Sequence, residues 1–340
     1  MRYRVLPACL ALFAAACLVP AGLCAQQAAP AKKLLSHEKR IADLEKEVEG
    51  LQKEVAFLKM APVPEQVVLC GRTIHLSDEE AREAFEREFY NFLDNRGLLT
   101  VLVKRYGKFL NVVSGEIDRM AMPPDLIYLP IAESYLNPRA VSRANAGGLW
   151  QFIKDTGKRE GLFINDSIDE RYSVKRSTRS ALGYLSRLQS EFGDWLVAMA
   201  AYNTGEVRVR EAIQNQNTRD FFEMFLPEET ERYVYRIAAL KEILSHPSKY
   251  GLPVHKADYY KPYSVAEITI EVERETPTAF LAAAMELPYR TFRQYNLHIR
   301  KYKLPRGTYH IYVPVEKKEA FLKRIGAGQG TDISIGKEEP

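Results

Sequence analysis

Residues 126–157 read LIYLPIAESYLNPRAVSRANAGGLWQFIKDTG, and this stretch decides the fold. An apolar run over 126–132 ends in a single acid, Glu133, which Ser134 follows directly. Burial of a carboxyl group favours its neutral form and raises its pKa, which suits a general acid that works near neutral pH. The acid alone leaves two interpretations open: a catalytic acid, or a buried structural glutamate held in a salt bridge.

A second feature of this stretch is the segment Gly148-Leu149-Trp150-Gln151. Its glycine lets the backbone come close to a ligand, and its aromatic residue can flank one. Trp150 equally fits a core position, because a tryptophan after an apolar residue packs as often as it binds. The segment therefore favours a binding wall without deciding the place of the tryptophan.

The composition of the whole chain is that of an ordinary globular protein. Its 340 residues, 46% hydrophobic and 27% charged, allow about two domains. The net charge of +4 is too small to indicate a nucleic-acid partner. The 19 tyrosines suit the faces of sugars, although most tyrosines in any protein simply pack.

The N-terminus is predicted to be a secretory signal peptide over residues 1–25. Arg2 and Arg4 precede an apolar stretch over 5–19, and proline and small residues follow. A retained membrane anchor is the less favoured alternative, because the stretch is short for a membrane span. The chain is therefore expected to be exported to the periplasm or cell envelope of a bacterium.

The cysteines bear on membrane attachment and on metals. Three of the four lie in the signal segment, so the mature chain is expected to keep only Cys70. One thiol can form neither an internal disulfide nor a thiolate zinc site, and no metal or cofactor is expected. Lipidation at Cys17 or Cys24 stays open, although the residues before each fit a lipoprotein signal poorly, and it would attach the protein to a membrane.

Residues 34–60 are predicted to form a coiled-coil helix. Apolar positions recur there at spacings of three and four: Leu34, Ile41, Val48 and Val55 alternate with His37, Leu44, Leu51 and Leu58. β-Branched residues at the first position and leucine at the second favour a parallel two-stranded coil, hence a homo-oligomer. An amphipathic helix packed on its own domain is the alternative.

The main domain is predicted over residues 77–250 and is all-α, after a short connector at 65–76. Helical periodicity recurs from Ser77 to Ser245 without a convincing strand. After Pro262 the pattern changes to a β-α-α-β unit over 262–316. The remaining residues, 317–340, are polar and are expected to be a partly disordered tail.

A set of motifs in a fixed order carries a family resemblance. They are LPIAES (129–134), NPRA (137–140), SRANAGGLWQF (142–152), TG (156–157), DER (169–171), ST (177–178), AAYNTG (200–205) and ETERYV (229–234). Together they resemble the lytic transglycosylase (SLT domain) family over about residues 80–250. The resemblance implies a lysozyme-like α-helical fold.

The same resemblance implies cleavage of the MurNAc–GlcNAc β-1,4 bond of peptidoglycan without a cofactor. Glu133 would protonate the glycosidic oxygen and then take the proton of the C6 hydroxyl, which attacks C1 and leaves a 1,6-anhydroMurNAc end. Since the substrate supplies the nucleophile, one acid suffices, whereas ordinary glycosidases need two. Asp155, Asp166 and Asp169 are interpreted as caps or salt-bridge partners.

Further site residues follow from the motifs. The resemblance implies that the substrate is bound by Ser134, Gly148, Trp150, Gln151, Tyr202, Asn203 and Tyr233. Ser134 would lie near the substrate or orient Glu133, and Tyr233 would contact the acid. Tyr202 and Tyr233 are alternatively core aromatics.

The C-terminal unit over 262–316 is similar to a LysM module, which binds N-acetylglucosamine chains. The similar positions are Thr276, Phe280, Ala284, Leu287, Phe292, Asn296, Leu304, Gly307 and Pro314. The usual Gly-Asp-Thr opening is replaced by Glu275-Thr276-Pro277, so a glycan-binding module and a structural appendage both stay open.

The leading hypothesis is an exported peptidoglycan lytic transglycosylase whose partners are glycan strands. Two alternatives differ from it in chemistry and in class. One is a hydrolytic muramidase that uses water and a second carboxylate. The other is a non-catalytic wall-binding scaffold assembled through the coil, against which the presence of Glu133 argues.

Overall fold

The computed structural model describes residues 37–52, 61–252, 255, 259–326 and 332–336. The chain divides into two compact units, Met1–Ala61 and Pro62–Pro340, which are described separately. The predicted signal peptide lies outside the described residues, as do 34–36 and 53–60 of the predicted coil. Among the described residues, no helix is both long and apolar enough to cross a membrane.

In the first unit, residues 37–52 form a helix, which lies within the range predicted for the coiled coil. Its heptad seam is exposed at every apolar position, namely Ile41, Leu44, Val48 and Leu51. The pairing of this seam with a second copy stays a prediction.

The second unit begins with a β-hairpin, where the sequence analysis expected only a connector. Strand β1 (Gln66–Leu69) pairs antiparallel with β2 (Arg72–His75). Cys70 and Gly71 join the strands, and both have positive φ (49° and 82°), as a two-residue hairpin turn requires. Leu69 is buried, so the alternation of apolar residues at 67, 69 and 74 was the missed signal.

Eight α-helices follow between residues 79 and 245. They are α2 (Glu79–Asp94), α3 (Arg96–Arg119), α4 (Tyr128–Ser134), α5 (Lys154–Arg159), α6 (Val174–Phe192), α7 (Trp195–Thr204), α8 (Glu206–Gln216) and α9 (Glu228–Ser245). The β structure within residues 77–250 is limited to isolated bridges, so the predicted mainly α fold is confirmed.

Side-chain caps fix several of the helix starts. Asp78 accepts a hydrogen bond from Ala81 N (2.9 Å) at the start of α2. Asp194 caps α7 by accepting from Leu196 N at 2.6 Å. Ser173 caps helix α6 by accepting a hydrogen bond from Arg176 N at 3.2 Å.

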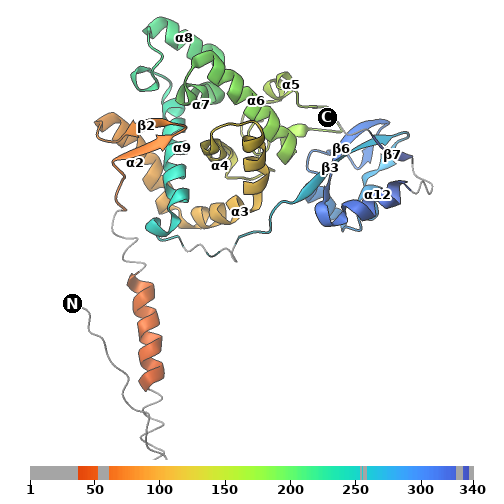
Figure 1. Cartoon of the computed structure of the whole chain (residues 1–340), viewed down its shortest axis with the longest axis horizontal. Helices are drawn as coiled ribbons and strands as arrows, with labels where there is room; N and C mark the ends of the chain where they lie inside the picture. Colours follow the sequence, from red (N-terminus) through yellow and green to blue (C-terminus); the bar gives the residue numbers. More distant parts are fainter. Residues whose placement is uncertain (1–36, 53–60, 253–254, 256–258, 327–331, 337–340) are drawn as a thin grey trace, which may run out of the picture. The chain divides into compact units, whose positions relative to one another are not determined.

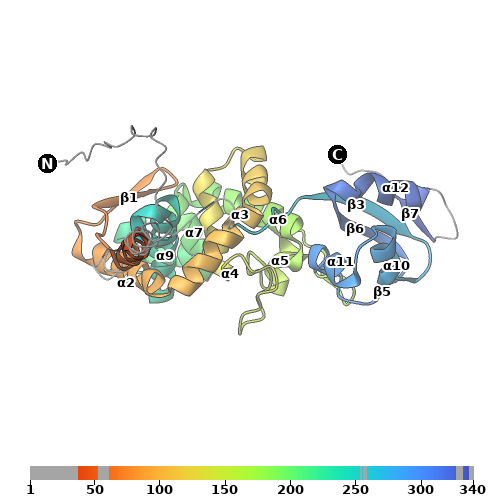
Figure 2. The same ribbon diagram turned by 90° about the horizontal axis from the view of Figure 1, so that it is seen from below.

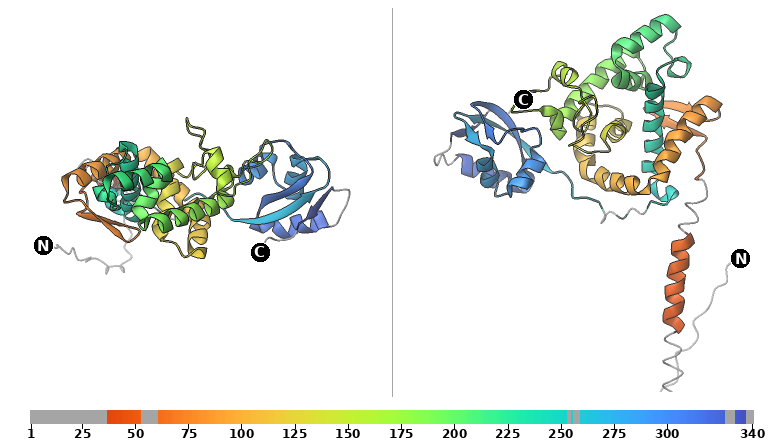
Figure 3. Two further views of the ribbon diagram at one scale, coloured as in Figure 1. Left: turned by 90° about the horizontal axis from the view of Figure 1, so that it is seen from above. Right: turned by 180° about the vertical axis from the view of Figure 1, so that it is seen from behind.

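The helices form a ring around α4 (Figures 1 and 3). In this ring α3 packs on α6, α6 on α7 and α7 on α9, while α4 lies inside against α9. Residues 196–201 of α7 are fully buried and apolar, so this short helix forms part of the core. The enclosed α4 is the element that carries Glu133.

The C-terminal region has the predicted β-α-α-β order. Its elements are β3 (Val265–Val272), β4 (Thr276–Pro277), α10 (Thr278–Ala284), α11 (Tyr289–Tyr295), β5 (Lys303–Leu304) and β6 (Gly307–Pro314). Strands β3 and β6 pair antiparallel, with Ile268 opposite Ile311, and both side chains lie in one apolar core. Figure 2 shows α10 and α11 beside this sheet.

The C-terminal tail was expected to be partly disordered, but the residues of it that the structure describes form regular elements. Residues 318–326 form helix α12 (Lys318–Gly326), and β7 (Ile333–Ile335) adds a third strand beside β3. Phe321 and Ile325 lie four residues apart on the buried face of α12. Because most of their neighbours in the sequence are charged, the pattern did not indicate a buried helix face here.

The C-terminal region is joined to the helical domain by backbone pairing. Ile168 forms a β-bridge with Ile299, and Arg300 N donates to Ser167 O at 2.7 Å. These bonds attach the loop after α11 directly to the loop after α5.

An ion-pair cluster supports the same junction. Glu267 on β3 pairs with Arg176 (2.9 Å) and Arg179 (3.0 Å) on α6. Burial alone would raise the pKa of Glu267, but the two guanidinium groups outweigh it and lower that pKa. The carboxylate is therefore held ionised between the two regions.

Candidate active site

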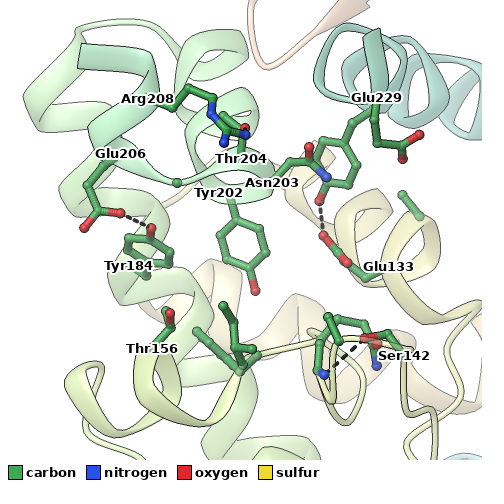
Figure 4. Close-up of a pocket in the computed structure, with 18 of the residues that line it drawn as sticks. Glu133, Ser142, Thr156, Tyr184, Tyr202, Asn203, Thr204, Glu206, Arg208 and Glu229 are labelled. Atoms are coloured by element: carbon green, nitrogen blue, oxygen red, sulfur yellow. Dashed lines mark hydrogen bonds between the residues drawn. The ribbon is translucent and has the colours of Figure 1, made fainter. Parts of the chain in front are cut away.

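A cleft of about 950 Å³ lies on the helical domain and contains Glu133 in its wall. Its other lining side chains come from the loop after α4 and from α5, α6, α7, α8 and α9 (Figure 4). They include Ser142, Gln151, Thr156, Arg159, Tyr184, Tyr202, Asn203, Thr204, Glu206, Arg208, Glu211, Glu229, Tyr233 and Arg236.

Glu133 is the penultimate residue of α4, and the chain turns sharply behind it. Tyr135 and Leu136 both have φ of 52°, in the left-handed region, so the helix ends there. The Glu133 carboxylate accepts a hydrogen bond from the Tyr233 hydroxyl at 2.7 Å. Burial raises the pKa of Glu133 to about 7, although the bond from Tyr233 and the charge of Arg236 act in the opposite direction.

Tyr233 reaches the acid from α9, the helix against which α4 packs. Its side chain is almost completely buried, and burial together with Glu133 raises its pKa well above the ordinary value. The phenol therefore stays protonated and donates to the carboxylate. One turn later, Arg236 is held by Glu88 (2.8 Å) and Glu229 (3.0 Å), which fixes a positive charge near the acid.

Two predicted site residues support the cleft wall from behind and do not line it. The Ser134 hydroxyl is buried and donates to Leu149 O at 2.8 Å, which ties α4 to the 148–151 segment. Trp150 is fully buried, and its indole N–H donates to Thr178 Oγ1 at 2.9 Å. A side chain without exposed surface cannot contact a sugar. The predicted substrate-binding role of Trp150 is therefore corrected to its alternative, a core position.

Gly148 also belongs to the support of the wall. It has φ of +81°, and a β-carbon placed on it would lie 1.8 Å from Arg171 O. Only glycine fits this contact between the 148–151 segment and the loop before α6. Gly148 O accepts a hydrogen bond from Gln151 Nε2 at 2.7 Å.

Gln151, Tyr202 and Asn203 do line the cleft together with Glu133. Gln151 has φ of 49°, which turns the chain at the cleft edge. The Tyr202 hydroxyl donates to Trp150 O at 2.8 Å and so bridges α7 to the 148–151 segment. The structure thus brings four predicted residues of the site, including Tyr233, around the acid.

The sequence analysis missed a second polar group in the cleft. The Tyr184 hydroxyl donates to Glu206 Oε2 at 2.7 Å, and Arg159 lies 3.1 Å from Glu206 Oε1. Burial alone would raise the pKa of Glu206, but the bond from Tyr184 and the charge of Arg159 lower it. Figure 4 shows Tyr202 between Glu133 on one side and Tyr184 with Glu206 on the other.

The cleft also holds more carboxylates than expected. Glu206, Glu211 and Glu229 line it, whereas the sequence analysis found no second acid for the site. The three aspartates considered there lie outside the cleft lining, and Asp169 pairs with Arg171 at 2.7 Å as predicted. Glu229 opens one of the motifs and Glu206 directly follows another, but whether these side chains face the cleft depends on how α8 and α9 pack.

Comparisons with known proteins agree with the motif order. The family described as Transglycosylase SLT domain matches residues 114–225. Membrane-bound lytic murein transglycosylase D of Escherichia coli (strain K12) is 32% identical over 244 residues, covering 70% of this chain and 53% of that protein. A putative tributyltin chloride resistance protein of Alteromonas sp. (strain M-1) is 38% identical over 108 residues, covering 32% and 52%.

The chain spans about half the length of the curated relatives it matches. Among solved structures, the 70 kDa soluble lytic transglycosylase of Escherichia coli is similar at a TM-score of 0.36 and 21% identity, covering 46% of this chain and 27% of that one. The predicted resemblance is confirmed: residues 114–225 match the transglycosylase SLT domain family.

Proposed function

We propose that this protein is a peptidoglycan lytic transglycosylase. It cleaves the β-1,4 bond between MurNAc and GlcNAc and leaves 1,6-anhydroMurNAc ends. One observation carries the proposal: Glu133 stands in the wall of a cleft of about 950 Å³ with its pKa raised to about 7. The match to the SLT domain over the same residues supports it.

In the first step, protonated Glu133 gives its proton to the glycosidic oxygen, and the bond from that oxygen to C1 of MurNAc breaks. The N-acetyl group of the sugar stabilises the positive charge that develops at C1. Tyr233 keeps its hydrogen bond to the carboxylate that results, at 2.7 Å.

In the second step, the Glu133 carboxylate takes the proton of the C6 hydroxyl, whose oxygen bonds to C1. No water is consumed, and Glu133 returns to its acid form. A pKa of about 7 suits both directions of transfer, because the acid and its base are both populated at neutral pH.

Binding of the sugars is assigned to the cleft-lining residues Gln151, Tyr202 and Asn203. Their amide and hydroxyl groups can exchange hydrogen bonds with N-acetyl and hydroxyl groups. Ser134, Gly148 and Trp150 act behind them by holding the wall in place.

Digestion of purified sacculi tests the reaction. Mass analysis of the released muropeptides should give products one water lighter than hydrolysis would give. Glu133→Gln should remove this release yet bind sacculi like the unchanged protein. Release of reducing MurNAc ends alone would refute the lyase.

Hydrolysis remains the second candidate, because Glu206, Glu211 and Glu229 also line the cleft. A muramidase would need one of them to activate water. Glu206→Gln and Glu229→Gln therefore serve as tests: loss of all turnover in either variant, together with reducing ends from the parent protein, would favour the muramidase. A scaffold without catalysis would release no product from sacculi at any enzyme concentration.

We further propose that the protein is exported to the cell envelope and dimerises through residues 34–60. The exposed seam at Ile41, Leu44, Val48 and Leu51 supports the second point. Replacing Leu44 and Leu51 with lysine should halve the mass measured by light scattering. An unchanged mass would refute pairing through this seam. The C-terminal LysM-like region is proposed as a structural partner of the helical domain, given its backbone pairing at Ile299.

A further inference from the structure

A second polar cavity lies where the C-terminal region meets the helical domain. It has a volume of about 300 Å³ and is lined by Arg139, Val141, Tyr172, Arg293, Leu297 and Arg300. A smaller cavity of about 220 Å³ shares Arg139 and Leu297 with it and adds Arg105 and Lys108. The two cavities together are called the basic groove below.

The charge of the basic groove is not balanced. Five cationic side chains line it, namely Arg105, Lys108, Arg139, Arg293 and Arg300, and no carboxylate lines either cavity. The hydrogen bonds that their side chains donate end on backbone carbonyls of Tyr135, Lys301 and Leu297. Within the described part of the chain, none of the five has an ion pair.

The titration of Lys108 supports this description. Burial lowers the pKa of Lys108, and the charges of Arg105 and Arg139 lower it further. Like charges crowded in this way repel one another, so an anion that enters the groove lowers the energy of all of them. The groove is therefore suited to carboxylates.

The groove also offers apolar surface beside its charges. The Arg300 guanidinium lies over the Tyr172 ring, with its Cζ 4.5 Å from the ring centroid. Val141 is 58% exposed at the edge of the larger cavity. A ligand with both carboxylates and alkyl groups would contact both kinds of surface.

The position of the groove indicates which ligand this is. Val141 lines the groove and the next residue, Ser142, lines the Glu133 cleft, so one loop forms a wall of both. We propose that the basic groove binds the free carboxylates of the peptide stems on a peptidoglycan strand whose sugars occupy the cleft. This inference rests on the proposed function, since it takes the strand to lie beside Glu133.

A binding assay tests the proposal in the full chain with the Glu133→Gln change, so that the probe is not consumed. The groove variant replaces Arg139, Arg293 and Arg300 with glutamine. The matched control replaces exposed arginines outside the groove, Arg143, Arg290 and Arg306, with glutamine and so removes the same charge. Arg143 and Arg290 lie close in sequence to groove residues.

Intact sacculi and glycan strands freed of their stems by an amidase are the two probes. The groove variant should bind sacculi at least about tenfold more weakly than the control variant, because it loses three charge-assisted contacts. Both variants should bind stem-free strands alike. Equal binding of sacculi by both variants, or an equal loss on stem-free strands, would overturn the proposal.

Three further measurements make the outcome specific. A variant with lysine at positions 139, 293 and 300 should keep most of the binding, and its failure to do so at unchanged thermal stability would count against a charge-based site. Vesicles of equal parts phosphatidylglycerol and phosphatidylcholine test a membrane as the ligand. If the groove variant loses binding to vesicles alone, the assignment of the groove to peptide stems is overturned. Cleavage of stem-free strands by the parent protein tests the proposed function separately.

Discussion

The hydrogen bond from Tyr233 to Glu133 makes a prediction about the pH dependence of catalysis. In the proposed reaction Glu133 must be protonated at the start, so kcat/KM should fall as the pH rises through its pKa of about 7. The bond from Tyr233, at 2.7 Å, stabilises the charged carboxylate and lowers this pKa. Tyr233→Phe removes only the hydroxyl, so the pKa of Glu133 should rise and the alkaline limb should move to higher pH.

The size of this shift follows from the strength of the bond. A hydrogen bond to a charged group contributes about 1.5–3 kcal/mol, and the same bond to the neutral acid contributes about 0.5–1.5 kcal/mol. The difference is about 1.4 kcal/mol, which corresponds to about one pKa unit. The alkaline limb of Tyr233→Phe should therefore lie about one pH unit above that of the parent protein. The kcat at the optimum should fall as well, because the phenol also positions the acid.

Initial rates of anhydromuropeptide release, measured over the pH range at low substrate, give the position of the limb. Tyr202→Phe is the matched control, because it removes a phenol from the same cleft whose bond ends on Trp150 O and not on Glu133. Its rate should fall, but its limb should stay in place. A limb that does not move in Tyr233→Phe, or moves to lower pH, would refute the assignment of the limb to Glu133.

Three predictions concern stability and are checked by urea unfolding. Since burial raises the pKa of Glu133 above 4.5, the folded chain loses stability as the pH rises from about 4.5 to 7. Glu133→Gln should therefore add about 1–3 kcal/mol to the free energy of unfolding at pH 8 and nothing at pH 4. An equal gain at both pH values would contradict this. Trp150→Ala should cost about 3–5 kcal/mol through the cavity it leaves and the lost bond to Thr178, so a weaker substrate affinity at unchanged stability would count against its core position. Gly148→Ala should cost more than about 3 kcal/mol, because its β-carbon would meet Arg171 O; a stable variant would mean that the loop moves freely.

The helices and the acid could be predicted because their signals are local. Helical periodicity and caps act within one or two turns, so the helices between 79 and 245 followed from the sequence. The order of the motifs, through the family resemblance, also predicted the helical domain and the position of Glu133 within it. Asp194 illustrates how local these signals are, since it caps α7 by accepting hydrogen bonds from Leu196 N and Val197 N.

The features that could not be predicted depend on contacts between distant residues. Tyr184 and Glu206 lie 22 residues apart on α6 and α8, and only the packing of these helices joins them. The backbone pairing of Ile168 with Ile299 likewise has no local pattern. Helix α12 was missed for a different reason, because its two buried residues stand among charges that suit a solvated tail.

The other acids of the cleft bear on how one carboxylate can serve as acid and base. Both oxygens of Glu206 are engaged, one by Tyr184 and one by Arg159, and its pKa is lowered. It can neither donate a proton near neutral pH nor accept one without losing these partners.

Glu229 is similar in one respect, since one of its oxygens pairs with Arg236 at 3.0 Å. A muramidase needs a second carboxylate that is unengaged and able to activate water. Glu133, by contrast, accepts a hydrogen bond from a neutral phenol, which can stay hydrogen-bonded to it in both protonation states. The environments of Glu206 and Glu229 therefore support the proposed reaction, in which the substrate's own hydroxyl attacks C1, over one in which either of these two acids holds the attacking water.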